Sequence, residues 1–118
     1  MYEDQQTTIR IESARDYQLV HLEGELGLMT AEPVRQALAS SITAAQPLVV
    51  SLAALTAIDL CGLQLLCSAQ RSCQTNSLPF TLRAVPDWFQ EIVHTAGFHQ
   101  HPAFQAAWPD AVQEEICA

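Results

Sequence analysis

The sequence predicts an α/β domain in which helices pack on a mixed β-sheet. Three observations lead to this fold class. The chain begins with two segments of alternating polar and apolar residues, separated by a turn of hairpin length. A short β-branched run near the middle is typical of a strand buried on both faces. The later segments alternate between helical and strand-like patterns, which gives the order β-β-α-β-α-β-α.

The first two strands are expected at residues 7–12 and 17–22, where "TTIRIES" and "YQLVHLEG" alternate. Gly24 and Gly27 then indicate a loop. A helix follows and runs to about Ile42. Thr30 has the side chain of an N-cap for this helix, because its hydroxyl can accept a hydrogen bond from a free backbone N–H group.

The central strand is expected at residues 47–52, "PLVVSL", and residues 53–60 lead from it to the next helix. That central helix begins at Cys61 and runs to about Gln74. A strand at residues 78–85 and a helix at residues 86–97 complete the pattern. The aromatic residues expected to attach the C-terminal segment to the domain are Phe98, Phe104 and Trp108.

Length and composition limit the classes of function. The 118 residues are expected to form one domain, 1–118, with a core at about 7–98 and a C-terminal extension at 99–118. A net charge of −8 argues against binding to nucleic acid or to anionic membranes, which both need clustered cations. No signal peptide or membrane span is visible, so we expect a cytoplasmic protein with reduced cysteines.

The central helix carries three cysteines that point in three directions. Cys61, Cys67 and Cys73 are spaced by six residues, so successive side chains differ in direction by about 240° and cannot bind one metal ion. Cys67 and Cys73 fall on the stripe that faces the sheet, whereas Cys61 lies on the outer side with an exposed Leu65. We therefore expect no metal site and no cofactor.

Asp59 and Gly62 flank Cys61 at the start of this helix. Asp59 is expected to cap the helix by accepting from its first free N–H groups, a contribution of about 1 kcal/mol. Gly62 lets another group approach the first turn closely, because it has no side chain. A thiol-based redox sensor that uses Cys61 is one hypothesis for this arrangement, although the Asp59 carboxylate opposes formation of a thiolate beside it.

The run "PLVVSLAALTAIDLCGLQLLCSAQRS" resembles the central motif of the STAS domain family, in which a strand leads into a helix that begins with Ile-Asp and reaches Gly-Leu after two small residues. "LEGELGLMTAEPVRQAL" is similar to the family's Gly-Glu-Leu-Asp loop and first helix, and "VPDWFQEIVHTAGF" is similar to its third helix. The similarity covers residues 9–98 in the right order. The family includes anti-sigma factor antagonists and the C-terminal domains of sulfate transporters.

The resemblance implies a mixed sheet covered on one side by helices, and a function in binding rather than catalysis. Relatives of the anti-sigma-antagonist type dock onto a kinase-like partner through the start of the second helix and the loops beside it. Carried over to this chain, the partner-binding residues are Asp59, Leu60, Cys61, Gly62 and Leu65 on the helix, and Glu25, Leu26 and Gly27 in the loop at 25–29.

In these relatives, phosphorylation of a Ser or Thr just before the motif glycine breaks the complex, because a phosphate adds nearly two negative charges to the interface. The equivalent regulatory position here is Cys61, which a serine/threonine kinase cannot phosphorylate. The family's loop and strand-end aspartates correspond to Gly27 and Ser51. The docking surface is therefore expected to persist without this switch.

The motif "IDLCGLQLL" is similar to that of small, single-domain bacterial STAS proteins. The resemblance leaves the partner open: an anti-sigma factor or kinase-like protein, a chemosensory protein, or the ATPase of an ABC-type lipid transporter. We expect no enzyme, since no catalytic triad, GxSxG motif or Gly-rich phosphate loop is visible. A homodimer is compatible with an acidic domain that exposes a small apolar patch, although nothing in the sequence requires one.

Overall fold

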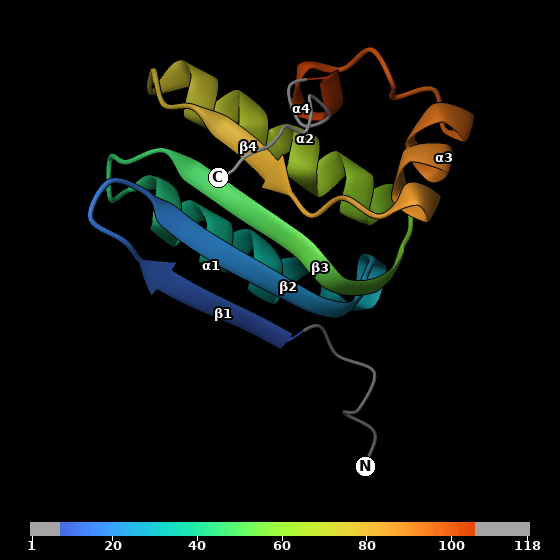
Figure 1. Ribbon diagram of the computed structural model, residues 1–118, viewed down its shortest axis with the longest axis horizontal. Coiled ribbons are helices and arrows are strands. Elements are labelled where there is room, and N and C mark those ends of the chain that lie inside the picture. Colours follow the sequence, from blue (N-terminus) through green and yellow to red (C-terminus); the bar gives the residue numbers. More distant parts are fainter. Residues whose placement is uncertain (1–7, 106–118) are drawn as a thin grey trace.

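Four strands form one mixed sheet with the order β1-β2-β3-β4 in the computed structural model, which describes residues 8–105 (Figure 1). β1 and β2 are antiparallel, whereas β2, β3 and β4 run parallel to one another. The strands are β1 (Thr8–Ser13), β2 (Gln18–Leu26), β3 (Leu48–Ile58) and β4 (Phe80–Arg83).

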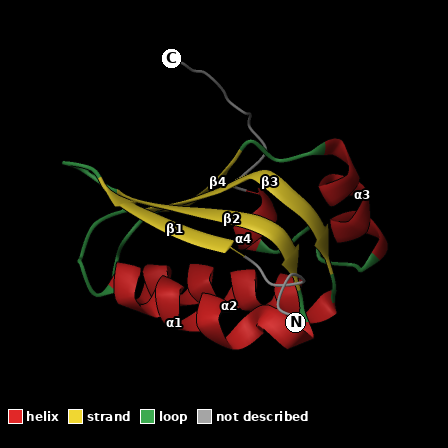
Figure 2. Ribbon diagram, turned by 90° about the horizontal axis from the view of Figure 1, so that it is seen from below, coloured by secondary structure: helices red, strands yellow, loops and turns green. Residues whose placement is uncertain are grey.

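The two long helices, α1 (Ala31–Ile42) and α2 (Leu60–Thr75), lie side by side on one face of the sheet (Figure 2). α3 (Asp87–Thr95) lies beyond the sheet at the end where β3 finishes, and the short α4 (Pro102–Gln105) contacts α2 and β4. The predicted mixed sheet with helices on one side is confirmed. No helix within residues 8–105 combines the length and the apolar character needed to cross a membrane.

The core lies between the sheet and the two long helices. Alternate residues of β2 and β3 point into it, and the predicted inner stripe of α2 packs against them. The buried residues of this stripe are Leu63, Leu66, Cys67, Ala69 and Cys73. The spacing of apolar residues in the sequence therefore determines which face of α2 packs against the sheet.

Several boundaries differ from those expected. β3 continues to Ile58 instead of ending at residue 52, because β2 runs beside it as far as Leu26. Gly24, expected in a loop, lies within β2 with φ +93°, next to a shift in the register of pairing with β3. A glycine adopts this φ without strain, so β2 bends there and continues.

Side chains of the C-terminal segment belong to the hydrophobic core. Phe104 of α4 is fully buried, and its ring centroid is 5.9 Å from that of Phe89 on α3. The predicted attachment through Phe98 and Phe104 is thus confirmed, since both belong to the core or pack against it. Thr7 of the first predicted strand and Trp108, the third aromatic residue of the predicted attachment, lie outside the described residues.

Candidate functional site

The site predicted from sequence lies where β2 and β3 end. Because these neighbouring strands are parallel, the segments that follow them meet at one end of the sheet. Leu26 of β2 is followed by Gly27 and a short 3-10 helix, η2 (Leu28–Thr30), and Ile58 of β3 is followed by Asp59 and α2. Residues about 30 positions apart in the sequence are thereby brought into contact.

Asp59 joins these two segments. Its Oδ1 accepts a hydrogen bond from the Gly62 backbone N–H at 3.1 Å, which confirms the predicted cap of α2. Its Oδ2 accepts from the Leu28 N–H, also at 3.1 Å, and its own N–H donates to the Leu26 carbonyl. The carboxylate therefore fixes the start of α2 and the start of η2 together, a second role that the sequence did not reveal.

Gly27 makes close contact with this carboxylate. A Cβ built on Gly27 would lie 2.5 Å from Asp59 Oδ2 and 2.9 Å from Asp59 Cγ, well inside van der Waals contact. The backbone of Gly27 is extended, with φ −162°, so any residue could adopt its conformation. Glycine is needed here for space, and this explains why an aspartate at the position of the family's loop aspartate would not fit this chain.

Gly62 is buried against the protein's own strands. A Cβ there would lie 2.6 Å from the Leu26 carbonyl oxygen and 2.6 Å from Ile58 Cγ1. The close approach that we predicted for Gly62 thus occurs, and the groups that approach are the end of β2 and the Ile58 side chain of β3.

Thr30 does not act as the side-chain cap that we expected for α1, since no helical N–H group donates to its hydroxyl. The hydroxyl donates to the Glu25 carbonyl and accepts from the Gly27 N–H at 3.0 Å. The hydroxyl therefore holds the turn between β2 and η2, because the backbone there bends back within bonding distance.

The predicted partner-binding residues differ in exposure. Leu26 is 1% exposed and Gly62 is buried, so neither offers a side chain to a partner. Gly27 is half-buried beneath Asp59. The residues with exposed side chains are Glu25, Asp59 and Leu60, and those that are half-buried are Cys61 and Leu65.

Leu28 and Met29 add the largest exposed apolar area at this end. Leu28 is 70% exposed, Met29 is 90% exposed and Leu60 is 53% exposed. The loop at 25–29 belongs to the predicted surface, but these two side chains are not among the predicted partner-binding residues. The sequence feature that could have identified them is the pair of large apolar residues directly after Gly27. We call Leu28, Met29 and Leu60 the apical patch.

Leu65 is less exposed than its position on the outer side of α2 suggested. α1 packs beside α2, and Leu65 lies in a shallow groove of about 200 Å³ between them. The helix pattern alone could not show this, because it does not reveal which face of α2 a second helix covers. Leu65 is therefore half-buried, and it lies at the edge of the contact between the two helices.

The cysteines of the described residues are free thiols. Burial raises the pKa of the Cys67 thiol, with a small opposing effect from Arg71, and raises the pKa of the Cys73 thiol to about 11. Both are therefore protonated near neutral pH, as expected of buried cysteines. Within residues 8–105, no three His, Cys, Asp or Glu side chains are grouped closely enough to hold a metal ion.

A family model described as "Mlab, STAS domain" matches residues 9–106. The fold is similar to that of an anti-sigma factor antagonist from Mycobacterium paratuberculosis, with 22% identity, a TM-score of 0.67 and 80% of each chain covered. No curated protein matches the chain.

Two further solved structures share the fold. The phosphorylated Bacillus cell fate determinant SpoIIAA is 16% identical, with a TM-score of 0.63 over 80% of this chain and 87% of that one. The murine anion transporter Slc26a9 is 13% identical, with a TM-score of 0.64 over 80% of this chain and 16% of that one. The same fold thus occurs as a small protein and as a minor part of a transporter.

Proposed function

Since the chain belongs to the STAS family, we propose that it is a non-catalytic interaction module that docks a signalling protein through the apical patch and the start of α2. The partner class is an anti-sigma factor, a related kinase-like protein or a chemosensory protein, as the resemblance implies. We place this docking in the cytoplasm, because the three free thiols of the described residues suit a reducing compartment.

The observation that carries this proposal is the grouping of exposed apolar side chains. Within residues 8–105, the large apolar side chains that are exposed are Ile11, Leu28, Met29 and Leu60. Three of these four form the apical patch, and Asp59 fixes the backbone on both sides of it. A rigid apolar patch of this kind suits a protein interface, because binding then orders few additional groups.

The charge around the patch indicates the chemistry of the partner. Glu25 and Asp59 are exposed beside it, and the chain carries a net charge of −8. A partner with an apolar centre and basic residues around it would be attracted to this surface and held by it. The same charge disfavours acidic partners.

Cys61 lies half-buried in the first turn of α2, next to Leu60 of the patch. It occupies the position where phosphorylation would break the complex in relatives of the anti-sigma-antagonist type. A cysteine cannot receive that phosphate, so docking here is not switched off at this residue. A fixed negative charge at Cys61 would imitate the phosphate and should release the partner.

The test begins with capture of the tagged protein and its partners from a native cell extract, identified by mass spectrometry. The captured partner is then purified, and its affinity is measured for each variant by calorimetry. Leu60→Asp and Cys61→Asp should each weaken binding about thirtyfold, or about 2 kcal/mol, because a charge is forced into an apolar contact. Thermal unfolding verifies that each variant is folded.

Two matched controls separate the effect of the added charge from the effects of side-chain volume and of position in the fold. Cys61→Asn has nearly the shape of Cys61→Asp without its charge, and Ala44→Asp adds the same charge at the exposed turn before β3, the other end of the sheet. Both controls should keep the affinity of the original chain. Equal affinity of Leu60→Asp and Ala44→Asp would remove the apical patch from the proposal.

A second candidate partner is the ATPase of an ABC-type lipid transporter. The description of the matching family model, "Mlab, STAS domain", favours it, because the resemblance links small STAS proteins to such an ATPase. The same surface and the same variants apply to the signalling partner and to the ATPase. Capture of an ABC-type ATPase, lost on Leu60→Asp and kept on Ala44→Asp, would select this candidate over the signalling one.

A further inference from the structure

The outer edge of β1 has no strand beside it among the described residues. β1 pairs with β2 on one side only, and Figure 1 shows no described element beyond its other side. An edge strand of this kind presents unpaired N–H and C=O groups, to which a further strand can bind. The side chains of β1 decide which strand fits.

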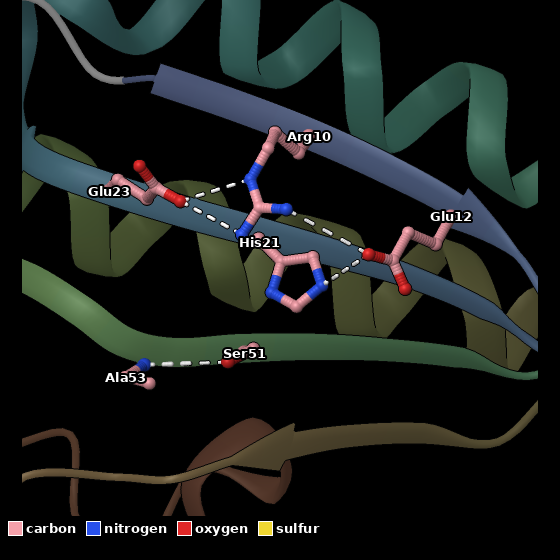
Figure 3. Close-up of polar contacts among 6 residues, drawn as sticks. All are labelled: Arg10, Glu12, His21, Glu23, Ser51 and Ala53. Atoms are coloured by element: carbon pink, nitrogen blue, oxygen red, sulfur yellow. Dashed lines mark hydrogen bonds and ion pairs between the residues drawn. The ribbon is translucent and has the colours of Figure 1, made fainter.

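Arg10 and Glu12 lie on the face of the sheet that α1 and α2 do not cover (Figure 3). Arg10 Nη2 is 3.0 Å from Glu23 Oε2 on β2, and Arg10 Nη1 is 3.8 Å from Glu12 Oε2. The side chains of Arg10 and Glu12 are 54% and 57% exposed, so both can reach across the free edge.

Ile11 points to the opposite face, toward the helices, since it pairs with the buried Val20. It is 45% exposed, and it is the exposed large apolar side chain of residues 8–105 that does not belong to the apical patch. The free edge therefore combines a cation and an anion on one face with an apolar side chain on the other.

We propose that β1 binds β1 of a second copy of this chain, antiparallel, with the two-fold axis passing through Ile11. Arg10 then lies opposite Glu12 of the partner subunit, and Glu12 lies opposite Arg10 of the partner subunit. Ile11 packs against its own counterpart. The two four-stranded sheets join into one continuous sheet across a self-complementary contact.

The charges select this register over its neighbours. In an antiparallel pair, directly opposed residues have their side chains on the same face of the sheet. A two-fold axis between two neighbouring residues would oppose side chains on different faces, so the axis must pass through a residue. An axis through Arg10 would place two arginines opposite each other, and an axis through Glu12 would place two glutamates opposite each other. Like charges directly opposed destabilise a strand pair, whereas opposite charges stabilise it.

This inference goes beyond the docking function and uses different residues. The dimer gives the chain two apical patches in one particle, so a partner with two binding sites would be held more tightly than by a single copy.

Charge reversal with mixing tests the pairing. Sedimentation equilibrium of the full chain at physiological ionic strength should show a dimer. Arg10→Glu gives two acidic residues on β1 and Glu12→Arg gives two basic ones, so each variant alone should dimerise at least tenfold more weakly. An equimolar mixture restores every opposite-charge pair, and it should recover a heterodimer. Circular dichroism verifies the fold, because both variants also alter the contacts with Glu23 or His21.

A cysteine cross-link tests the register directly. In a Cys61→Ala/Cys117→Ala background, Ile11→Cys places two thiols directly opposite, with Cα atoms roughly 4.5–5.5 Å apart, within the range that a disulfide spans. Mild oxidation with copper–phenanthroline in air should then give a linked dimer. Ser13→Cys is the control, because its two copies would be about 14 Å apart, too far for a disulfide.

Each result supports or overturns the proposal. Recovery of the heterodimer in the mixture, together with linkage at residue 11 and not at residue 13, supports it. A chain that sediments as a monomer at every concentration overturns it. So does a dimer that Arg10→Glu and Glu12→Arg leave unchanged, since such a dimer uses another surface. Neither result bears on the docking of a partner, because these residues lie outside the apical patch.

Discussion

Replacement of Gly27 by alanine should destabilise the original chain, but it should stabilise a protein in which Asp59 is also replaced by alanine. In the original chain, the new Cβ would lie 2.5 Å from Asp59 Oδ2, so the carboxylate must move. Its movement breaks the hydrogen bonds to the Gly62 and Leu28 N–H groups. The cap contributes about 1 kcal/mol, and the second bond contributes about 1 kcal/mol.

A gain offsets part of this loss. Gly→Ala at an extended φ restricts the unfolded chain and stabilises the fold by about 0.5 kcal/mol. Gly27→Ala should therefore lower the free energy of unfolding by about 1.5 kcal/mol, or the melting temperature by about 6 °C. In an Asp59→Ala background the obstructing atoms are absent, and the same change should stabilise the protein by about 0.5 kcal/mol. The coupling energy is then about 2 kcal/mol.

Urea unfolding followed by far-UV circular dichroism measures all four proteins of this cycle, with equal m-values as the condition for comparing them. Asp59→Asn is the matched control. It keeps the volume of the side chain and loses its charge, so Gly27→Ala should remain costly in that background. Equal effects of Gly27→Ala, within about 0.5 kcal/mol, in the original chain and in the Asp59→Ala background would contradict the coupling between these two residues.

The remaining predictions concern titratable groups. His101 Nδ1 accepts from the Ala103 N–H at 3.1 Å, and burial, with a smaller effect of Arg71, lowers the His101 pKa below 6.5. The unfolded chain therefore binds the proton more readily, and stability should fall as the pH drops through 6.5. His101→Asn keeps an acceptor for Ala103 and should flatten this fall in urea titrations at several pH values; an unchanged slope would contradict the assignment. The Cys73 thiol, with its pKa raised to about 11, should react with iodoacetamide only on unfolding, whereas the half-buried Cys61 should react in the native state. Peptide mapping over time measures both rates, and early labelling of Cys73 would show that α2 opens locally.

Local patterns in the sequence were sufficient for the main elements. Alternating residues predicted β1 and β2, and the apolar stripe predicted α2. The predicted ends of these three elements lie within a few residues of the observed ends. Asp59 was identified as the cap of α2, because a cap depends on residues within one turn of each other. The resemblance to the STAS family rests on the same segments, and the matching family model confirms it.

Boundaries that depend on pairing between strands were predicted less well. β3 was expected to end at residue 52 and continues to Ile58, since β2 continues beside it through the bend at Gly24. Nothing in "AALTAI" alternates strongly enough to indicate a strand. Its hydrogen bonds to a neighbouring strand, and not its own composition, keep it extended.

The sequence by itself determined the order of the elements, the face of α2 that enters the core and the capping role of Asp59. Each of these depends on residues close together in the chain. Only the tertiary structure decided that Asp59 also holds Leu28, that Gly27 must lack a side chain and that Leu26 and Gly62 are buried. Those contacts join residues about 30 positions apart, and their distances are set by the parallel pairing of β2 with β3.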